Sequence, residues 1–564
     1  MNHTYKTSFN TSIRKSALTG AFLLSLLGCG TTEYQVHEAP LAGVTEPNIE
    51  NIKGHMHFLA DDLLEGRDTG SQGHEIASLY IASEFKKYGL MPGGADDSYF
   101  QRIKFRKSLL VQESPSLSFE GEDGFSLDYP KDYLVSPNAV YQDAAIEAPL
   151  VFVGYGIVSE ELAHDDYQGL DVTGKVVVYL SGKPASFPSE EGAHIASTTQ
   201  KRKYAVARGA VGIISLQTPS NEEVRPYQRS LSYIHVPRMR WVGDDGIPGN
   251  VSPEIKAGAY LNLASGKRLF KNAPRTLEDI FTDLDDDKSP KGFELPLSVN
   301  LAYQSTHNDL TSPNVAGILE GSDPVLKDEF VIFTAHSDHI GISKSVKKDR
   351  INNGAMDNAS GVSVMLETAR MFSTLAEKPK RSILFLAVTG EEKGLLGADY
   401  FAQNPTIDGE MVANVNLDMP LLTYEFADVI AFGASHSTMG ISVDNATQNA
   451  GIKLTADPWP KLNLFTRSDH YSFVKQGVPA IFLVTGIESK SPDIDGSQVL
   501  NNFLATNYHK PSDDMQQDFV WAAADTFTRV NYEIGLELAN QPAKPAWYRD
   551  SFFGKTFGKH LTDK

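Results

Sequence analysis

The sequence predicts an α/β protein in which a mixed, largely parallel central sheet is flanked by helices and a mainly β segment is inserted. Three observations support this prediction. From residue 301 to residue 545, runs that are apolar throughout alternate with helical segments, which is typical of parallel strands buried on both faces. Residues 49–114 begin with apolar side chains at helical spacing. Residues 115–300 instead show short apolar runs separated by Gly, Pro and Asp turns, which indicates a β-rich segment.

Length and composition exclude several classes of protein. A chain of 564 residues is too long for one ordinary domain, and 41% hydrophobic with 22% charged residues is the composition of a folded, soluble protein. The net charge of −20 argues against a nucleic-acid partner, because binding phosphates requires a basic surface. The chain has one Cys, which excludes intramolecular disulfides and Cys-based zinc clusters.

The N-terminus has the layout of an export signal. Basic residues precede an apolar run at 21–28 that is too short to span a bilayer, and Leu26-Leu27-Gly28-Cys29 resembles a bacterial lipobox. The sequence therefore predicts a lipoprotein signal peptide at 1–28, lipidation of Cys29 and a polar tether at 29–48. The exported protein would be attached to the membrane through its lipid alone, at the outer membrane facing the periplasm or at the cell surface. An ordinary signal peptide with an incidental Cys is the alternative.

The remaining elements follow in order along the chain. Residues 49–114 open with two helical patterns around a polar, Gly-punctuated loop at 65–70. The segment 115–300 is expected to hold one or two helices, one of them at 201–208. Residues 546–564 are expected to form a C-terminal tail. The elements predicted for 301–545 are strands at 330–335, 383–388, 411–417 and 480–484, and helices at 359–375, 395–402, 437–450 and 519–538.

Polar residues follow directly on three of these predicted strands. His336-Ser337-Asp338-His339 comes after the first strand, Glu391-Glu392 after the second and Asp418 after the third. Two loops add Asp357 and His509. Because the carboxyl ends of parallel strands meet at one edge of a sheet, these side chains are expected to converge there. Mixed His and carboxylate sets bind divalent metals such as zinc or manganese, and a carboxylate shared by two ions is the arrangement of two-metal hydrolases.

Other hydrolytic and nucleotide-binding chemistries lack their motifs. No G-x-S-x-G turn is present for a serine nucleophile. His74-Glu75 is followed by Ser78 where an H-E-x-x-H zinc helix needs its second His. Neither a P-loop nor a G-x-G-x-x-G sequence occurs.

The series of motifs from Ala335 to His509 resembles the M28 family of metallopeptidases. The inserted segment, through residues 170–178 and 205–214, looks like the protease-associated (PA) domain found in many members. The motifs that carry the M28 resemblance are Ala335-His336-Ser337-Asp338-His339, Gly354-Ala355-Met356-Asp357-Asn358-Ala359-Ser360-Gly361-Val362, Glu391-Glu392-Lys393-Gly394-Leu395-Leu396-Gly397, Asn416-Leu417-Asp418-Met419, Arg467-Ser468-Asp469-His470 and Tyr508-His509.

The resemblance implies a zinc-exopeptidase fold and a metallo-aminopeptidase that hydrolyses peptides with two divalent metal ions, with zinc as the expected metal. Asp357 would bridge the two ions, and the peptide bond after it is often cis in this family. His336 and Asp418 would complete one metal site, and Glu392 and His509 the other.

The resemblance also implies catalytic roles for two carboxylates. Glu391 would be the general base, taking a proton from the attacking water and passing it to the leaving amine. Asp338 would accept the second ring N–H of His336 and so fix the tautomer of that imidazole.

The residue that stabilises the oxyanion departs from the family pattern. Some members place a Tyr just upstream of the Ser-Asp-His motif, where this chain has Phe465 and Thr466. Arg467 and Tyr471 are the substitutes that the sequence offers, and it does not rank them.

Alternative functions remain at this point. A glutaminyl cyclase-like enzyme on a related scaffold would use one metal ion and would not need all five ligands. A non-catalytic binding protein is the third interpretation, since some relatives have lost ligands. The sequence does not separate aminopeptidase from dipeptidase or carboxypeptidase action, and it does not fix the side-chain preference or the oligomeric state.

Overall fold

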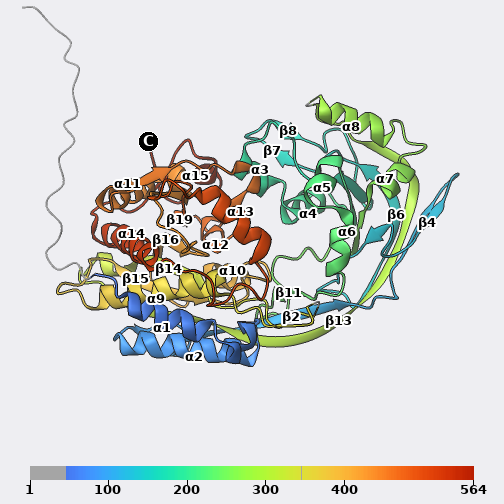
Figure 1. Ribbon diagram of the computed structural model, residues 1–564. Helices are drawn as coiled ribbons and strands as arrows, with labels where there is room; N and C mark the ends of the chain where they lie inside the picture. The colour runs from blue at the N-terminus through green and yellow to red at the C-terminus, as the bar shows by residue number, and fades with distance from the viewer. Residues whose placement is uncertain (1–45, 287, 345) are drawn as a thin grey trace, which may run out of the picture. The chain divides into compact units, whose positions relative to one another are not determined.

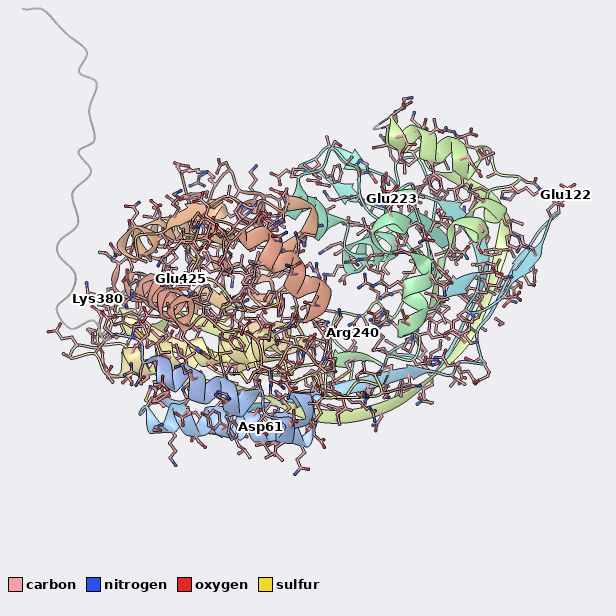
Figure 2. The ribbon with its side chains drawn as sticks, in the orientation of Figure 1. Asp61, Glu122, Glu223, Arg240, Lys380 and Glu425 are labelled. Carbon is pink, nitrogen blue, oxygen red and sulfur yellow. The ribbon has the colours of Figure 1, made fainter. Side chains whose placement is uncertain are left out.

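The computed structural model describes residues 46–286, 288–344 and 346–564 (Figure 1), and Figure 2 adds their side chains. The predicted signal peptide at 1–28, the lipidation of Cys29 and most of the tether at 29–48 lie outside the described residues. Within the described part of the chain, no helix is both long enough and apolar enough to cross a bilayer.

The centre of the fold is a mixed sheet whose middle strands run parallel. Its strands, in order across the sheet, are β2 (Phe100–Leu110), β13 (Phe293–Leu319), β15 (Ser382–Val388), β14 (Glu329–His336), β16 (Glu410–Leu417), β19 (Ala480–Thr485), β17 (Asp428–Phe432) and β18 (Lys453–Thr455). β15, β14, β16 and β19 are parallel to one another. β13 is antiparallel to β15 and β17 is antiparallel to β19, whereas β18 runs parallel to β17. The parallel strands are apolar and almost completely buried, as the predicted α/β class requires.

Helices cover both faces of this sheet. On β14, Ile332 packs with side chains of α10 and α12, whereas the next residue, Phe333, contacts Phe372 of α9. Successive residues of a strand point to opposite faces, so these helices lie on opposite sides. The covering helices are α9 (Gly361–Ser373) and α14 (Trp521–Asn540) on one side and α10 (Leu396–Gln403) and α12 (His470–Val474) on the other.

Shorter elements complete this part of the chain. α1 packs against α9, and α2 packs against β13 (Figure 1). These and the remaining elements are α1 (Ile49–Leu59), α2 (Gln72–Lys87), β1 (Met91–Pro92), α11 (Met439–Asn449), α13 (Gly496–Thr506), β20 (Trp547–Tyr548), α15 (Phe552–Phe557) and β21 (Leu561–Thr562).

Strand β13 joins the central sheet to a second sheet. It is 27 residues long, and its first half pairs with β6 (Asp143–Phe152) and β3 (Ser116–Glu120). Its second half pairs with β2 and β15. The boundary expected at residue 300 therefore falls inside one continuous strand, so the insert and the central sheet share their backbone hydrogen bonding at this point.

The inserted segment contains more helix than the sequence indicated. Six α-helices lie among its described residues, where one or two were expected. The helices are α3 (Ser189–Ile195), α4 (Thr198–Val206), α5 (Pro219–Val224), α6 (Tyr227–Ser230), α7 (Leu263–Leu269) and α8 (Leu277–Asp285). Several of them are short and polar, such as α5, which buries no residue and shows no apolar periodicity, but α8 buries Leu277, Ile280 and Phe281 at helical spacing. The further strands are β4 (Phe125–Leu127), β5 (Tyr133–Leu134), β7 (Val158–Ser159), β8 (His164–Asp165), β9 (Val176–Leu180), β10 (Gly212–Leu216), β11 (Arg238–Trp241) and β12 (Ala257–Leu261).

Candidate metal centre

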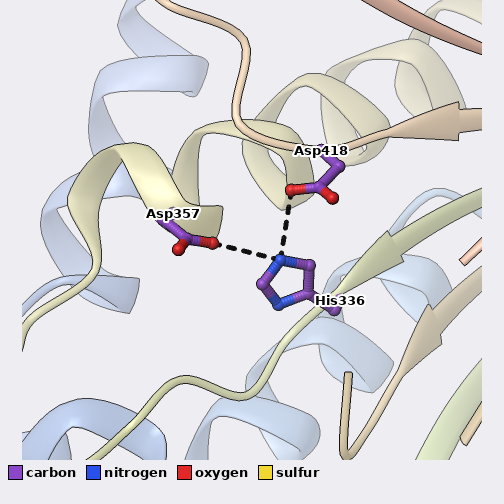
Figure 3. A group of neighbouring side chains, drawn as sticks. All are labelled: His336, Asp357 and Asp418. Carbon is purple, nitrogen blue, oxygen red and sulfur yellow. Dashed lines mark hydrogen bonds and ion pairs between the residues drawn. The ribbon is translucent and has the colours of Figure 1, made fainter. Parts of the chain in front are cut away.

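The first group of possible metal ligands lies where β14 ends. His336 is the last residue of that strand, and 1% of its surface is exposed. Its Nε2 lies 3.2 Å from Oδ1 of Asp357 and 3.3 Å from Oδ1 of Asp418. Figure 3 draws both contacts as dashed lines. Asp418 directly follows β16, so two neighbouring parallel strands deliver His336 and Asp418 to one edge of the sheet. His336, Asp357 and Asp418, here named the first group, lie close enough together to hold one metal ion.

A second group adjoins the first and shares Asp357 with it. It consists of His339, Asp357 and Glu392. Nδ1 of His339 lies 2.7 Å from Oε1 of Glu392 and 4.0 Å from Oδ2 of Asp357. His509 approaches the same carboxylates from the surface, with its Nε2 3.1 Å from Oε2 of Glu392 and 3.3 Å from Oδ2 of Asp357. The two groups and His509 thus bring all five expected ligands together, and they add His339, for which no ligand role was predicted from the sequence.

The backbone of the loop around Asp357 is fixed by hydrogen bonds to a buried carboxylate. Asp357 lies in a short π-helical turn, η4 (Ala355–Ser360), and the peptide bond that follows it is cis, as the resemblance implied. The buried carboxylate of Asp513 accepts hydrogen bonds from the backbone N–H groups of Met356 at 2.9 Å and of Asp357 at 3.0 Å. One carboxylate oxygen of Asp357 faces the first group and the other faces the second, which is the orientation that a bridging ligand needs.

Asp338 supports the site through a different contact from the one expected. The prediction that its carboxylate accepts the ring N–H of His336 is wrong, because the atom 3.1 Å from Nδ1 of His336 is the backbone oxygen of Asp338. The carboxylate accepts hydrogen bonds from Oγ1 of Thr69 at 2.8 Å and from the backbone N–H of Glu391 at 3.1 Å. A fully buried carboxylate needs such donors, and these two are the ones within reach. Asp338 therefore positions the backbone of Glu391 as well as the imidazole of His336.

Arg67 is a structural support that sequence reasoning missed. Only 1% of its surface is exposed, and its guanidinium donates to the backbone oxygens of Ser337 at 3.1 Å, Asn353 at 2.7 Å and Gly354 at 3.1 Å. Burial lowers its pKa to about 10, while nearby carboxylates, with Asp513 foremost, oppose that shift. An Arg in a polar loop carries no sequence signal of this kind, because the carbonyl groups that it binds belong to distant parts of the chain.

Glu391 lies beside the first group and belongs to neither group. Its Oε2 is 4.0 Å from Nε2 of His336. Burial, together with the neighbouring carboxylates of Glu392 and Asp418, raises the pKa of Glu391 well above its usual range. A carboxyl group that takes up protons more readily than an ordinary glutamate is suited to exchanging them with a reacting molecule.

The tyrosines near the site differ in what their hydroxyl groups contact. The hydroxyl of Tyr471 hydrogen-bonds with Nδ1 of His194 in α3, so it is directed into the insert. Arg467 is exposed. The ring of Tyr508 stacks on that of His509, with ring centroids 3.8 Å apart and an interplanar angle of 23°. Burial, and then nearby carboxylates with Asp357 and Glu392 foremost, raise the pKa of Tyr508 above its usual range.

The donor set fits divalent metal ions. Oε1 of Glu392 and both ring nitrogens of His339 are buried and have no hydrogen-bond partner among the described residues. Buried polar atoms without a partner cost free energy, and clustered buried carboxylates repel one another unless a cation lies between them. Imidazole nitrogens and carboxylate oxygens are also the ligands that zinc takes in proteins. The residues are therefore suited to two ions that share Asp357.

Comparison with known proteins identifies similar chains. Residues 314–534 match the model of Peptidase family M28, so the M28 resemblance is confirmed over this segment. A probable zinc metalloprotease of Pyrenophora tritici-repentis is 29% identical over 228 residues, which are 34% of this chain and 49% of the relative. Aminopeptidase YwaD of Bacillus subtilis is 27% identical over 229 residues, 40% of this chain and 45% of the relative. Mouse aminopeptidase NAALADL1 is 34% identical over 143 residues, 24% of this chain and 16% of the relative.

Solved structures are also similar. An aminopeptidase from Aneurinibacillus sp. strain AM-1 aligns with a TM-score of 0.49 at 19% identity, covering 88% of this chain and 95% of the other. The chain spans about half the length, or less, of the curated relatives that it matches.

Proposed function

We propose that this chain is a dinuclear metal-dependent aminopeptidase, which releases N-terminal residues from peptides. The observation that carries the proposal is the pair of ligand groups that share Asp357 at the carboxyl edge of the parallel strands, with Glu391 beside them. The match of residues 314–534 to family M28 supports peptide hydrolysis. Relatives named as aminopeptidases support action at the N-terminal end of the substrate.

The ligands divide between two ions. His336 and Asp418 would hold one ion, Glu392 and His509 the other, and Asp357 both. Divalent ions in these sites would polarise the peptide carbonyl group and lower the pKa of water toward neutrality. Zinc is the expected metal, because the donors are imidazole and carboxylate groups and because relatives are named as zinc metalloproteases. Two groups with a common carboxylate also favour this function over a cyclase with a single zinc ion.

Glu391 would act as the general base. It is not a member of either ligand group, yet its Oε2 lies 4.0 Å from Nε2 of His336. Its carboxylate would take a proton from the attacking water and deliver it to the amine that leaves when the peptide bond breaks. The hydrogen bond from its backbone N–H to Asp338 holds the main chain in place while the side chain exchanges the proton.

Tyr508 would stabilise the negative oxygen that forms as water adds to the carbonyl carbon. Its ring stacks on that of His509, one of the proposed ligands. The pKa of Tyr508 is raised, so the phenol keeps its proton and can donate it in a hydrogen bond. Tyr471, in contrast, already has a partner in His194.

Hydrolysis of matched peptides tests the proposal. The full chain, loaded with zinc, would be incubated with peptides that carry a free amino group and with the same peptides N-acetylated. We expect the N-terminal residue to be released from the free peptides alone, and a chelator to abolish that release. Release of C-terminal residues from the blocked peptides would indicate a carboxypeptidase, and cyclisation of an N-terminal Gln would indicate the cyclase; either would contradict the proposal.

The membrane attachment is a separate proposal, which rests on the sequence around Cys29. We infer that residues 1–28 are removed and that Cys29 carries lipid, because the single Cys of the chain directly follows an apolar run at 21–28. Cys29→Ser should then move the protein from the membrane fraction to the soluble fraction, with unchanged activity per molecule. Detergent-phase partitioning that persists in this variant would contradict the lipid anchor.

The insert at 115–300 is proposed to be a PA-like domain. The residues that carry the resemblance fall on regular elements, since 170–178 lead into β9 and 205–214 connect α4 with β10. β9 and β10 are paired in parallel at the centre of the second sheet. Helix α3 of the insert also contacts the segment near the Ser-Asp-His motif, through hydrogen bonds such as Ser189 to Asn463 at 2.9 Å.

A further inference from the structure

His339 is held rigidly beside the second group. None of its surface is exposed, and its backbone N–H donates to the carbonyl oxygen of Arg67 at 3.1 Å. Gly354 lies against the imidazole with φ of 61°, and a Cβ at that position would lie 2.7 Å from the ring. A glycine is therefore needed there both for its backbone conformation and for the space that the imidazole occupies.

The imidazole of His339 lies close to a carboxylate but is not hydrogen-bonded to it. Nδ1 is 2.7 Å from Oε1 of Glu392, yet neither atom has a hydrogen-bond partner within the described residues, because their alignment is poor for an N–H···O bond. Leaving both atoms buried and unpaired is unfavourable. A nitrogen and an oxygen that lie near each other without pointing at each other are suited to binding one cation together, whose tetrahedral ligands at about 2.0–2.2 Å would lie about 3.4 Å apart.

His509 reaches the same pair of carboxylates from another direction. The two imidazole rings have centroids 5.7 Å apart and are inclined at 73°, so they do not compete for the same position. His339 is completely buried, whereas 36% of the His509 side chain is exposed. The carboxylates of the second group therefore have the buried His339 on their inner side and the partly exposed His509 on their solvent side.

We propose that His339 is a further protein ligand of the ion held by Asp357, Glu392 and His509, which makes the two metal sites unequal. This inference rests on the proposed dinuclear function. The second site would have four protein ligands, whereas the first group supplies three. Four protein ligands are typical of closed zinc sites that hold their ion firmly, and three leave a position for water or substrate. As metal is added, the second site should therefore bind its ion first, and as metal is removed it should lose its ion last.

The test compares the zinc affinity of the full chain with that of its His339→Asn variant. The affinity is measured by competition with a chromogenic chelator, and the number of zinc ions bound per chain is determined for both proteins. Asparagine retains an N–H donor that could orient Glu392, but an amide is a poor zinc ligand. Loss of an outer hydrogen-bond partner of a metal ligand weakens binding about 10- to 100-fold, and loss of the ligand itself should weaken it by at least about 100-fold. We expect the affinity for one of the two ions to fall by at least about 100-fold and the affinity for the other ion to stay unchanged.

A matched control and a rescue variant keep the test decisive. His470 is also completely buried and has no hydrogen-bond partner among the described side chains, but it belongs to neither ligand group, so His470→Asn should keep both ions. His339→Cys offers a thiolate, which is a zinc ligand, and should bind the weakened ion at least about tenfold more tightly than His339→Asn.

The outcomes separate this inference from the proposed function. If His339→Asn keeps both affinities, or if His339→Cys is no better than His339→Asn, His339 is not a ligand and the inference is wrong. An active wild-type protein with two ions would leave the proposed function standing in that case. If the wild-type chain binds no zinc, the proposed function itself fails.

Discussion

The two ligand groups differ in how the chain supplies their side chains. In the first group, His336 and Asp418 stand at the ends of β14 and β16, so the register of two parallel strands fixes their separation. In the second group, His339 and Glu392 come from loops, as does the neighbouring His509. The strand register places His336 and Asp418, and hydrogen bonds with Asp338 and Ser468 then hold their side chains, whereas loop ligands depend on the surrounding network for their backbone position as well.

That network is visible around the second group. Arg67 binds the carbonyl groups of two of the loops, Asp513 binds the backbone of the η4 turn, and Gly354 leaves space for the ring of His339. Each support is buried and comes from a distant part of the sequence. Substitutions of these supports should therefore affect the site although none of them is a ligand.

Removing the residue common to both groups should have the largest effect. Asp357→Ala takes a ligand from each site and would leave two positive ions facing each other without a bridging charge, a repulsion that a buried environment strengthens. We expect this variant to bind at most one ion per chain, even with excess metal, and to lose activity. His509→Ala removes one ligand from one site, and excess metal should restore the ion at that site.

Metal analysis after dialysis decides between these expectations. Two ions retained in Asp357→Ala, or a more severe loss in His509→Ala, would show that a different carboxylate forms the bridge. Circular dichroism of both variants controls for folding.

A smaller effect should distinguish the two tyrosines. Tyr508→Phe removes a hydroxyl group near the ligand groups, and kcat should fall about 10- to 100-fold with metal content unchanged, at or somewhat below the loss seen when an oxyanion donor is removed. Tyr471→Phe, whose hydroxyl group faces His194 of the insert, should keep kcat within about twofold. The reverse order, measured by steady-state kinetics on one free peptide, would assign the oxyanion contact to Tyr471.

The fold was predictable where the sequence pattern is regular. The strands expected at 330–335, 383–388, 411–417 and 480–484 correspond to β14, β15, β16 and β19 with shifts of about one residue. Their apolar character results directly from burial on both faces. β17, β18 and α13 were not anticipated. The two strands are five and three residues long, too short to establish a period, and α13 buries only Gly496 and Phe503.

The candidate site was predictable in its composition but not in its contacts. All five expected ligands lie together, since the resemblance fixed which motifs converge. The position of the Asp338 carboxylate depends on two donors, Thr69 and the backbone of Glu391, that no local pattern reveals. His339 belongs to a motif that the sequence displays, but the direction of its ring is set by Gly354 and the fold around it.

The proposed function requires two metal ions bound at a site whose general base is a separate residue. Measuring both the zinc content and the rate of peptide hydrolysis of the variant Glu391→Gln is the sharpest test of this arrangement. Glutamine preserves size and hydrogen bonding but cannot accept the proton from water. We expect kcat on a free peptide to fall by at least about 100-fold, in line with general-base contributions. Zinc content should stay at two ions per chain, because Glu391 is in neither ligand group. A variant that remains active, or one that loses zinc, would contradict the assignment.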